Sequence, residues 1–225
     1  MRIPIPPHSW ALAPREAIAV QRELAARVRV EPIGAAPRLV AGLDAAFSRD
    51  GRDCVAGVVL WDGETGRVVE QHVARRPLTF PYVPGLLSFR EAPALLAVLE
   101  RLNTAPDVLL CDGQGLAHPR RFGIACHLGV LLDLPSVGCA KSRLIGDATE
   151  PGQKRGDREL LHDGAAVIGC VLRSRDSVRP LYVSVGHRID LAGAVELVLA
   201  CGGGFRLPEP TRRADRLVAA DVSPR

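Results

Sequence analysis

Short apolar runs alternate along this chain with polar, glycine-rich or proline-rich breaks. Apolar runs of about four to eight residues bounded by turn residues are typical of strands, and apolar residues three or four positions apart are typical of helices. This pattern predicts strands at 38–47, 54–62, 67–75, 108–111, 135–140, 165–172 and 181–185. It predicts helices at 14–30, 88–102, 121–133 and 191–199, and a last helix after the proline-marked loop at 207–210.

The order of these elements indicates the fold class. The strands at 38–47, 54–62 and 67–75 are joined by short turns, so they are expected to form an antiparallel meander. With the helix, strand, helix and strand that follow, this order is typical of an α/β, ribonuclease H-like fold. Such a fold has a mixed central sheet flanked by helices, and its first and fourth strands are neighbours. The helix at 14–30 is expected to cover the sheet, and the polar segment 146–163 to be an exposed excursion.

Length and composition narrow the classes of protein. The chain has 225 residues, and no linker, internal repeat or low-complexity tract divides it, so residues 1–225 are expected to form one domain. We expect this domain to be a monomer. Its 47% hydrophobic and 24% charged residues are ordinary for a soluble globular protein. The net charge of +4 suits a polyanionic partner without requiring one.

The chain also carries signals about its location. No segment approaches the length of a transmembrane helix, and the first residues lack the uninterrupted apolar stretch of a signal peptide. The six cysteines form no CxxC pair, and most lie within apolar runs. We therefore expect buried free thiols in a cytoplasmic protein, without a membrane partner, rather than a zinc site or a disulfide framework.

The first candidate functional residue is Asp112, in the stretch VLLCDGQGLAHP. It directly follows a buried strand, and ligands of open α/β sheets bind beyond the carboxyl ends of the strands. Gly113 and Gly115 would let the backbone approach a phosphate or a sugar, because glycine has no Cβ. The alternative is an Asp-Gly turn in which Asp112 only accepts backbone hydrogen bonds.

Asp44 is a second carboxylate in an apolar setting, within the strand 38–47. A buried carboxylate is costly unless it is hydrogen-bonded, paired or bound to a cation, so a structural aspartate stays open as an alternative. In the predicted fold Asp44 and Asp112 are neighbours, and two such carboxylates repel each other unless a cation lies between them. Oxygen ligands favour Mg²⁺ or Mn²⁺, and such a pair suits metal-assisted phosphodiester hydrolysis.

Three further residues have both a structural and a functional interpretation. Ser88 and Glu91 match a capping box, but Glu91 lies close to a strand end and could take part in metal chemistry. Lys141 follows the strand 135–140, where a cation would face the same crevice, although it could be an ordinary surface lysine. Tyr82, between two prolines, could be a ring buried under its loop, or a wedge or stacking platform for a base.

Seven segments together resemble the endonuclease V family, the deoxyinosine-specific repair nucleases. They span nearly the whole chain in the family's order and read GLDAAF, VAGVVLWD, FPYVPGLLSFRE, LLCDGQGLAHPRRFGIACHLG, GCAKSRLIG, VGHRIDLAGAVELVL and LPEPTRRAD. The resemblance implies catalytic roles for five residues. Asp44 and Asp112 resemble the metal-binding aspartates and Glu91 the third acid. Asp215 falls at a late metal-site position that some members fill with histidine, and Lys141 resembles the lysine that steadies the phosphate.

The resemblance also implies two residues that contact DNA. Tyr82 resembles the wedge that fills the gap left by a flipped base, and His118 lies near the expected base pocket. The sequence departs from the family's pattern at Val185, where proline is expected, and this departure leaves the acids untouched.

The implied reaction is hydrolysis of the second phosphodiester bond on the 3′ side of deoxyinosine in deaminated DNA. It would use Mg²⁺, for which Mn²⁺ could substitute, after the weakly paired base is flipped out. Inosine-containing RNA stays open as a second substrate, which would make the enzyme a ribonuclease. A non-catalytic nucleic-acid binder is another alternative. Actin-like and sugar-kinase ATPases share related first strands, but they need two copies of the fold, which 225 residues do not hold.

Overall fold

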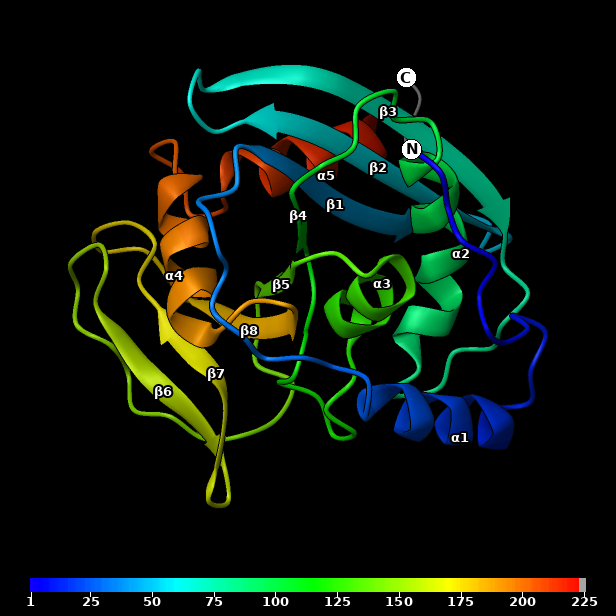
Figure 1. Ribbon diagram of the computed structural model, residues 1–225, viewed down its shortest axis with the longest axis horizontal. Coiled ribbons are helices and arrows are strands. Elements are labelled where there is room, and N and C mark those ends of the chain that lie inside the picture. Colours follow the sequence, from blue (N-terminus) through cyan, green and yellow to red (C-terminus); the bar gives the residue numbers. More distant parts are fainter. Residues whose placement is uncertain (223–225) are drawn as a thin grey trace.

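A mixed eight-stranded sheet is the framework on which the rest of the chain packs. The computed structural model describes residues 1–222, with strand order β3-β2-β1-β4-β5-β8-β7-β6 (Figure 1). The strands are β1 Leu39–Phe47, β2 Asp53–Asp62, β3 Arg67–Pro77, β4 Val108–Cys111, β5 Ser136–Ala140, β6 Arg158–Asp163, β7 Ala166–Leu172 and β8 Leu181–His187. The helices are α1 Pro14–Ala25, α2 Leu87–Leu99, α3 Ile124–Leu132, α4 Leu191–Ala200 and α5 Glu209–Val222.

The predicted meander and the predicted neighbours within it are confirmed. β2 pairs antiparallel with both β1 and β3, and β1 pairs in parallel with β4. In the parallel pair Leu43 lies opposite Cys111, so Asp44 within β1 and Asp112 just after β4 lie side by side. The predicted hairpin of the strands at 165–172 and 181–185 is confirmed as β7 and β8.

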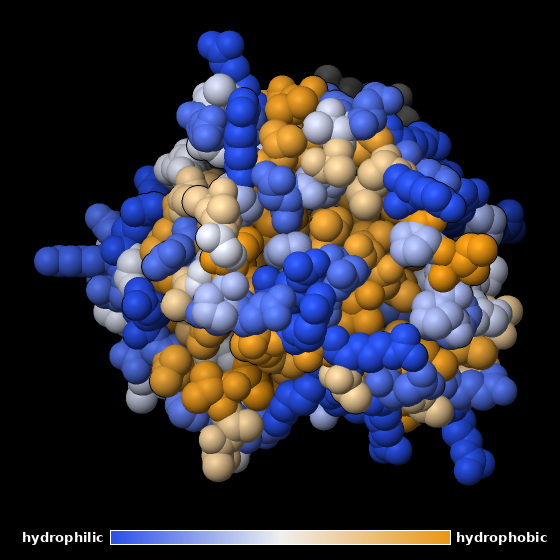
Figure 2. Space-filling view, in the orientation of Figure 1, coloured by the Kyte–Doolittle hydropathy of each residue, from blue (hydrophilic) through white to orange (hydrophobic). Residues whose placement is uncertain are grey.

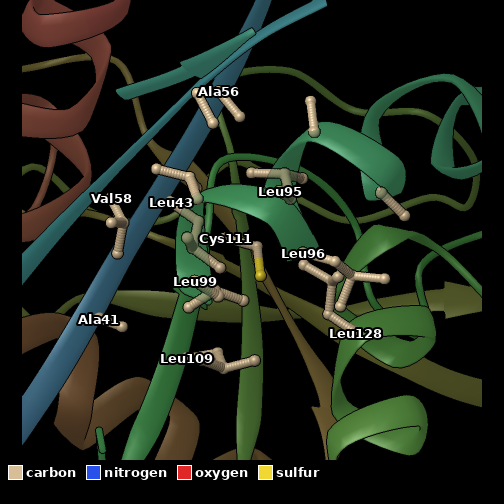
Figure 3. Packing of buried hydrophobic residues seen from close by; sticks show 14 of the residues in the cluster. Ala41, Leu43, Ala56, Val58, Leu95, Leu96, Leu99, Leu109, Cys111 and Leu128 are labelled. Carbon is tan, nitrogen blue, oxygen red and sulfur yellow. The ribbon is translucent and has the colours of Figure 1, made fainter. Parts of the chain in front are cut away.

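The strand β4 shows why some runs of the sequence are apolar throughout. Successive side chains of a strand point to opposite faces of the sheet, and both faces of β4 are covered. Leu109 and Cys111 pack against α2 and α3, whereas Val108 and Leu110 belong to the core on the side of α4. Figure 3 shows Leu109 and Cys111 among the buried side chains of the first of these cores.

Helix α1 does not cover the sheet as expected. It packs against α3 and against the loop 78–86, and Figure 1 shows it on the side of α3 that faces away from β1–β3. Its buried face includes Ala17 and Leu24. The amphipathic pattern correctly indicated a buried face, but such a pattern does not specify which element covers that face.

Two other details differ from the sequence-based expectation. Helix α2 begins at Leu87 with Leu86 as its N-cap, so Ser88 lies inside the helix and forms no capping box with Glu91. The Ser88 hydroxyl instead forms a hydrogen bond with Nδ1 of His127 at 3.1 Å. The segment 146–163 is not wholly irregular, because its last residues form β6 at the sheet edge. Only Leu161 of that strand is buried, so its sequence lacks an apolar run.

The six cysteines are free and buried, as expected. Within residues 1–222, no helix combines the length and the apolar character needed to cross a membrane. Figure 2 shows hydrophilic and hydrophobic side chains interspersed over the visible face of the molecule.

Helix α5 approaches β1 and β2 closely because two glycines leave room for it. A Cβ at Gly42 of β1 would overlap the backbone of Pro210. A Cβ at Gly57 of β2 would lie 3.0 Å from the carbonyl oxygen of Ala214. These contacts fix the depth at which α5, and with it Asp215, sits against the sheet.

We expect Gly42→Ala to lower the free energy of unfolding by about 3 kcal/mol, the upper range for overpacking a core. The added methyl group meets backbone rather than a flexible side chain, so either α5 or β1 must shift. Urea unfolding followed by circular dichroism measures the loss.

Gly34→Ala is the matched control, because no heavy atom lies within 4 Å of the position of its Cβ. We expect it to change the stability by less than about 0.5 kcal/mol. Equal stabilities of the two variants would contradict the role of Gly42 in seating α5.

Candidate metal centre and adjoining cavity

Three aspartates from distant parts of the chain meet at one edge of the sheet. Asp44 lies in β1, and Asp112 directly follows β4, where its backbone N–H donates to the carbonyl oxygen of Leu43 at 2.9 Å. Asp215 comes from α5, seated against the same strands. One carboxylate oxygen of each aspartate lies within 4.8 Å of those of the other two. The parallel pairing of β1 with β4 and the close packing of α5 therefore create this cluster.

Lys141 lies beside two of the three aspartates. It follows β5, the neighbour of β4, and its Nζ lies 2.6 Å from Asp112 Oδ2 and 2.7 Å from Asp215 Oδ1. The guanidinium of Arg206 donates to the Lys141 carbonyl oxygen at 2.6 Å and so holds its backbone. In the described part of the chain, no basic side chain forms an ion pair with Asp44.

The electrostatics show that the positive charge of Lys141 does not balance the negative charge of the cluster. Burial, and secondly the charge of Asp112, raise the pKa of Asp44 to about 7. Burial, and then the charges of Asp44 and Asp112, raise the pKa of Glu91 to about 8. Burial also raises the pKa of Asp112, although the hydrogen bond from Lys141 opposes this effect. Groups whose charged forms are so disfavoured mark a place where a cation would be stabilising.

The donor set fits a hard divalent cation. Carboxylate oxygens are the preferred ligands of such ions, and the three aspartates bring their oxygens within bridging reach of one another. Asp44 and Asp112 were predicted to be metal ligands, and the family resemblance placed Asp215 at a late metal-site position; the structure brings all three together. Glu91 is not part of the group of mutually close oxygens and lies buried behind it, coupled through charge.

A cavity of about 420 Å³ opens beside the acids. Asp112 and Lys141 line one part of it, and the loop 78–86 lines another. The exposed apolar side chains of Leu87 and Leu144 also line it. A cavity of this size with few polar groups at one end is typical of a small-ligand pocket.

Tyr82 projects from the loop at this cavity. Its side chain is 73% exposed, so the interpretation as a ring buried under the loop is wrong. The Arg90 guanidinium lies 5.9 Å from the centre of its ring. The placement leaves the ring free to contact a large partner.

His118 lies in the cavity wall with both ring nitrogens engaged. Nε2 donates to the carbonyl oxygen of Gly85 at 3.0 Å, and Nδ1 accepts from the backbone N–H of Arg120 at 3.1 Å. Burial, and secondly the charge of Arg120, lower the pKa of His118 to about 4, so the ring is neutral at pH 7. The structure places His118 near the expected pocket, but neither nitrogen is free to bind a base.

Three residues near this wall were not predicted from the sequence or were given a different role. A Cβ at Gly115 would overlap the carbonyl oxygen of Val185, so packing against β8 accounts for this glycine without a ligand. Gln21 and Arg120 were not singled out, yet both contact the wall at Gly85. One signal was present for Gln21, because it is a polar residue on the otherwise apolar face of α1.

The sequence profile of the endonuclease V family matches residues 22–216. The chain belongs to the endonuclease V family. It is 52% identical to an endonuclease V of Alkalilimnicola ehrlichii over 218 residues, which cover 96% of each chain. The wide coverage shows that the likeness extends far beyond the acids.

Solved endonuclease V structures share the fold. That of Streptomyces avermitilis has a TM-score of 0.91 at 44% identity, covering 96% of both chains. A Ciona intestinalis endonuclease V (D234N), in complex with a 23mer DNA containing an inosine followed by a ribo-adenosine, has a TM-score of 0.82 at 26% identity. The match covers 92% of this chain and 96% of that one. These likenesses and the observed sheet order confirm the predicted ribonuclease H-like fold.

The raised pKa of Glu91 leads to a prediction for metal-free protein. An acid whose pKa is raised by folding contributes stability below its unfolded value, and this stability is lost as the pH rises through the folded value. For Glu91 that window runs from 4.5 to about 8. In EDTA, we expect Glu91→Gln to match the wild type at pH 5 and to be more stable at pH 8.5, by on the order of a few kcal/mol.

Thermal unfolding at the two pH values measures the difference. Glu159→Gln serves as the control, because it makes the same change at an exposed position of β6. If the stabilities of the wild type and Glu91→Gln changed in parallel with pH, the raised pKa of Glu91 would be contradicted.

Proposed function

We propose that this protein is a DNA repair endonuclease directed at deoxyinosine, and that it hydrolyses the second phosphodiester bond on the 3′ side of the lesion. The observation that carries the proposal is the aspartate cluster, whose member Asp112 lines a cavity large enough for a nucleobase that the exposed Tyr82 also lines. Family membership supports the reaction class. The inosine-containing DNA bound to the Ciona intestinalis relative supports the substrate.

Asp44, Asp112 and Asp215 would hold a divalent cation, which we propose is Mg²⁺, with Mn²⁺ able to substitute. Such a cation, when bound, lowers the pKa of water and stabilises a leaving oxygen. It would also offset the burial and the charge of Asp112, which together raise the pKa of Asp44. Glu91 completes the acid set from behind the cluster, where its buried carboxyl group is coupled to the charges of Asp44 and Asp112.

Lys141 would steady the scissile phosphate. Its ammonium pairs with Asp112 and Asp215, and its side chain is 41% exposed on a flexible stem. A cation held by the carboxylates would compete for these partners, so the ammonium could turn towards a phosphate without moving the backbone that Arg206 holds.

Tyr82 would insert into the duplex where the base has left the stack. An exposed ring on a short proline-bounded loop suits this role, because little conformational entropy is lost when it binds. Inosine pairs weakly, so extruding it costs less than extruding a normally paired base. The cavity wall at His118 would receive the flipped base, with His118 acting through Gly85 rather than by direct contact.

We further propose that the chain acts as one domain and as a monomer in the cytoplasm. The helices and the meander of residues 1–222 all pack on or around one sheet, which supports a single domain. Six buried free thiols are in keeping with a reducing compartment. Inosine in RNA stays a second candidate substrate, and the test below includes it.

We expect the wild type to nick a labelled duplex with one deoxyinosine at the second 3′ bond, and only with Mg²⁺ or Mn²⁺. Asp112→Asn should lower cleavage by about 100-fold or more, because it weakens the cation site while keeping the shape of the side chain. Product mapping on a sequencing gel gives the position of the cut.

Asp50→Asn, in an exposed turn and outside the aspartate cluster, is the matched control and should cleave like the wild type. A cut at another bond would contradict the proposed cleavage position. Cleavage in the presence of EDTA would contradict the role of a cation. Binding without cleavage would favour a non-catalytic binder. An inosine-containing RNA strand, cut faster than the DNA, would make the enzyme a ribonuclease.

Tyr82→Ala should weaken binding of the deoxyinosine duplex by about tenfold, the range measured when a stacking ring is lost. The ring is mostly exposed, so the melting temperature should not change. Fluorescence anisotropy measures the affinity. Leu160→Ala, at an exposed position of β6, is the control and should bind normally. Wild-type affinity in Tyr82→Ala would rule out the wedge.

A further inference from the structure

The carbonyl oxygen of Gly85 accepts three hydrogen bonds. The donors are Nε2 of Gln21 at 3.0 Å, Nε2 of His118 at 3.0 Å and Nη2 of Arg120 at 2.6 Å. A carbonyl oxygen has two lone pairs, so three donors make it unusually crowded. They come from α1 and from the loop before α3, two segments that are distant in sequence from Gly85. The position of this oxygen is therefore fixed from separate directions.

Gly85 belongs to the turn that links Tyr82 to α2. The N–H of Leu86 donates to the carbonyl oxygen of Val83 at 3.0 Å, with Pro84 and Gly85 between them. Gly85 has a φ of +77°, which only glycine adopts readily, and Pro followed by Gly is typical of a type II turn. A Cβ at Gly85 would lie 2.6 Å from Arg120 Nη2, so the turn and its anchor fit each other.

Both polar atoms of the Gln21 side chain take part in this anchor. Its amide nitrogen donates to the carbonyl oxygens of Gly85 and, at 2.9 Å, Phe122, and its oxygen accepts from Nε of Arg120. The side chain has no exposure to solvent. A buried amide lowers the stability of the fold unless it forms hydrogen bonds, so the Gln21 side chain depends on these three bonds.

We propose that Gln21 and Arg120 are positioning residues, which hold the Tyr82 turn and the cavity wall in the geometry that receives a flipped base. The inference rests on the proposed function. Neither residue is required to touch DNA. Both act through the Gly85 carbonyl, which ties α1 to the wall. Without either of them, Gly85 loses a donor, and the other residue loses a partner, so the two substitutions should have coupled effects.

The test measures the preference for damaged DNA and the flipping itself. Gln21→Leu and Arg120→Met are compared with wild type on two duplexes, one with deoxyinosine and one undamaged, with Ca²⁺ replacing Mg²⁺ to slow hydrolysis. The strand opposite the deoxyinosine carries 2-aminopurine, whose fluorescence rises when it is unstacked. Gln71→Leu and Arg67→Met make the same changes at exposed positions of β3 and serve as controls.

We expect each variant to bind the deoxyinosine duplex about tenfold more weakly, the size of a lost hydrogen-bond contribution, and the undamaged duplex as the wild type does. The fluorescence rise should shrink in parallel. The double variant should bind the deoxyinosine duplex no more than about threefold more weakly than either single variant, because the two substitutions disrupt the same anchor at Gly85. The controls should keep the wild-type preference.

Gln21→Met guards against loss of folding. It keeps nearly the size of the side chain and places no charge in the buried site, but it cannot donate to Gly85, so it should show the same loss of preference with a cooperative unfolding transition. Folded variants that keep the wild-type preference and fluorescence rise would overturn the inference. A wild type that binds both duplexes equally would instead contradict the proposed function itself.

Discussion

Repulsion among buried carboxylates is the constraint on which this structure depends. The pairing of β1 with β4 brings Asp44 next to Asp112, and α5 adds Asp215, so three partly buried acids meet at one edge of the sheet. Lys141 balances two of them and leaves Asp44 without a basic partner among the residues described. Bringing these acids together lowers the stability of the fold and creates a site that strongly favours a cation. Raised pKa values at Asp44 and Glu91 are the direct expression of this cost.

The backbone packing that assembles the acids is as important as the acids. Asp215 reaches the cluster only because Gly42 and Gly57 let α5 lie close to β1 and β2. Larger residues there would move the helix outward and would open the cluster on one side. Glycines in two apolar strands, which weaken a strand by themselves, are therefore part of the construction of the site.

The sequence predicted best what depends on local pattern and on the order of elements. Apolar runs located the meander, and the strand order placed Asp44 beside Asp112. It predicted less well what depends on tertiary packing. Asp215 lies on a polar helix about a hundred residues beyond Asp112, and only the family resemblance pointed to it. Ser88 has the right spacing for a capping box, yet its hydroxyl bonds to His127 instead, because contact between α2 and α3 outweighs a local cap.

Gln21 shows how a failure of pattern can be informative. It occupies a buried position on α1 where an apolar residue would be expected, and the structure explains it through bonds to Gly85, Phe122 and Arg120. Different kinds of interaction thus hold the two parts of the site. Sheet pairing and close packing hold the acids, whereas a polar network holds the turn of Tyr82. A polar network depends on each of its members, so the cavity wall is the part whose geometry a single substitution can alter while the acids stay in place.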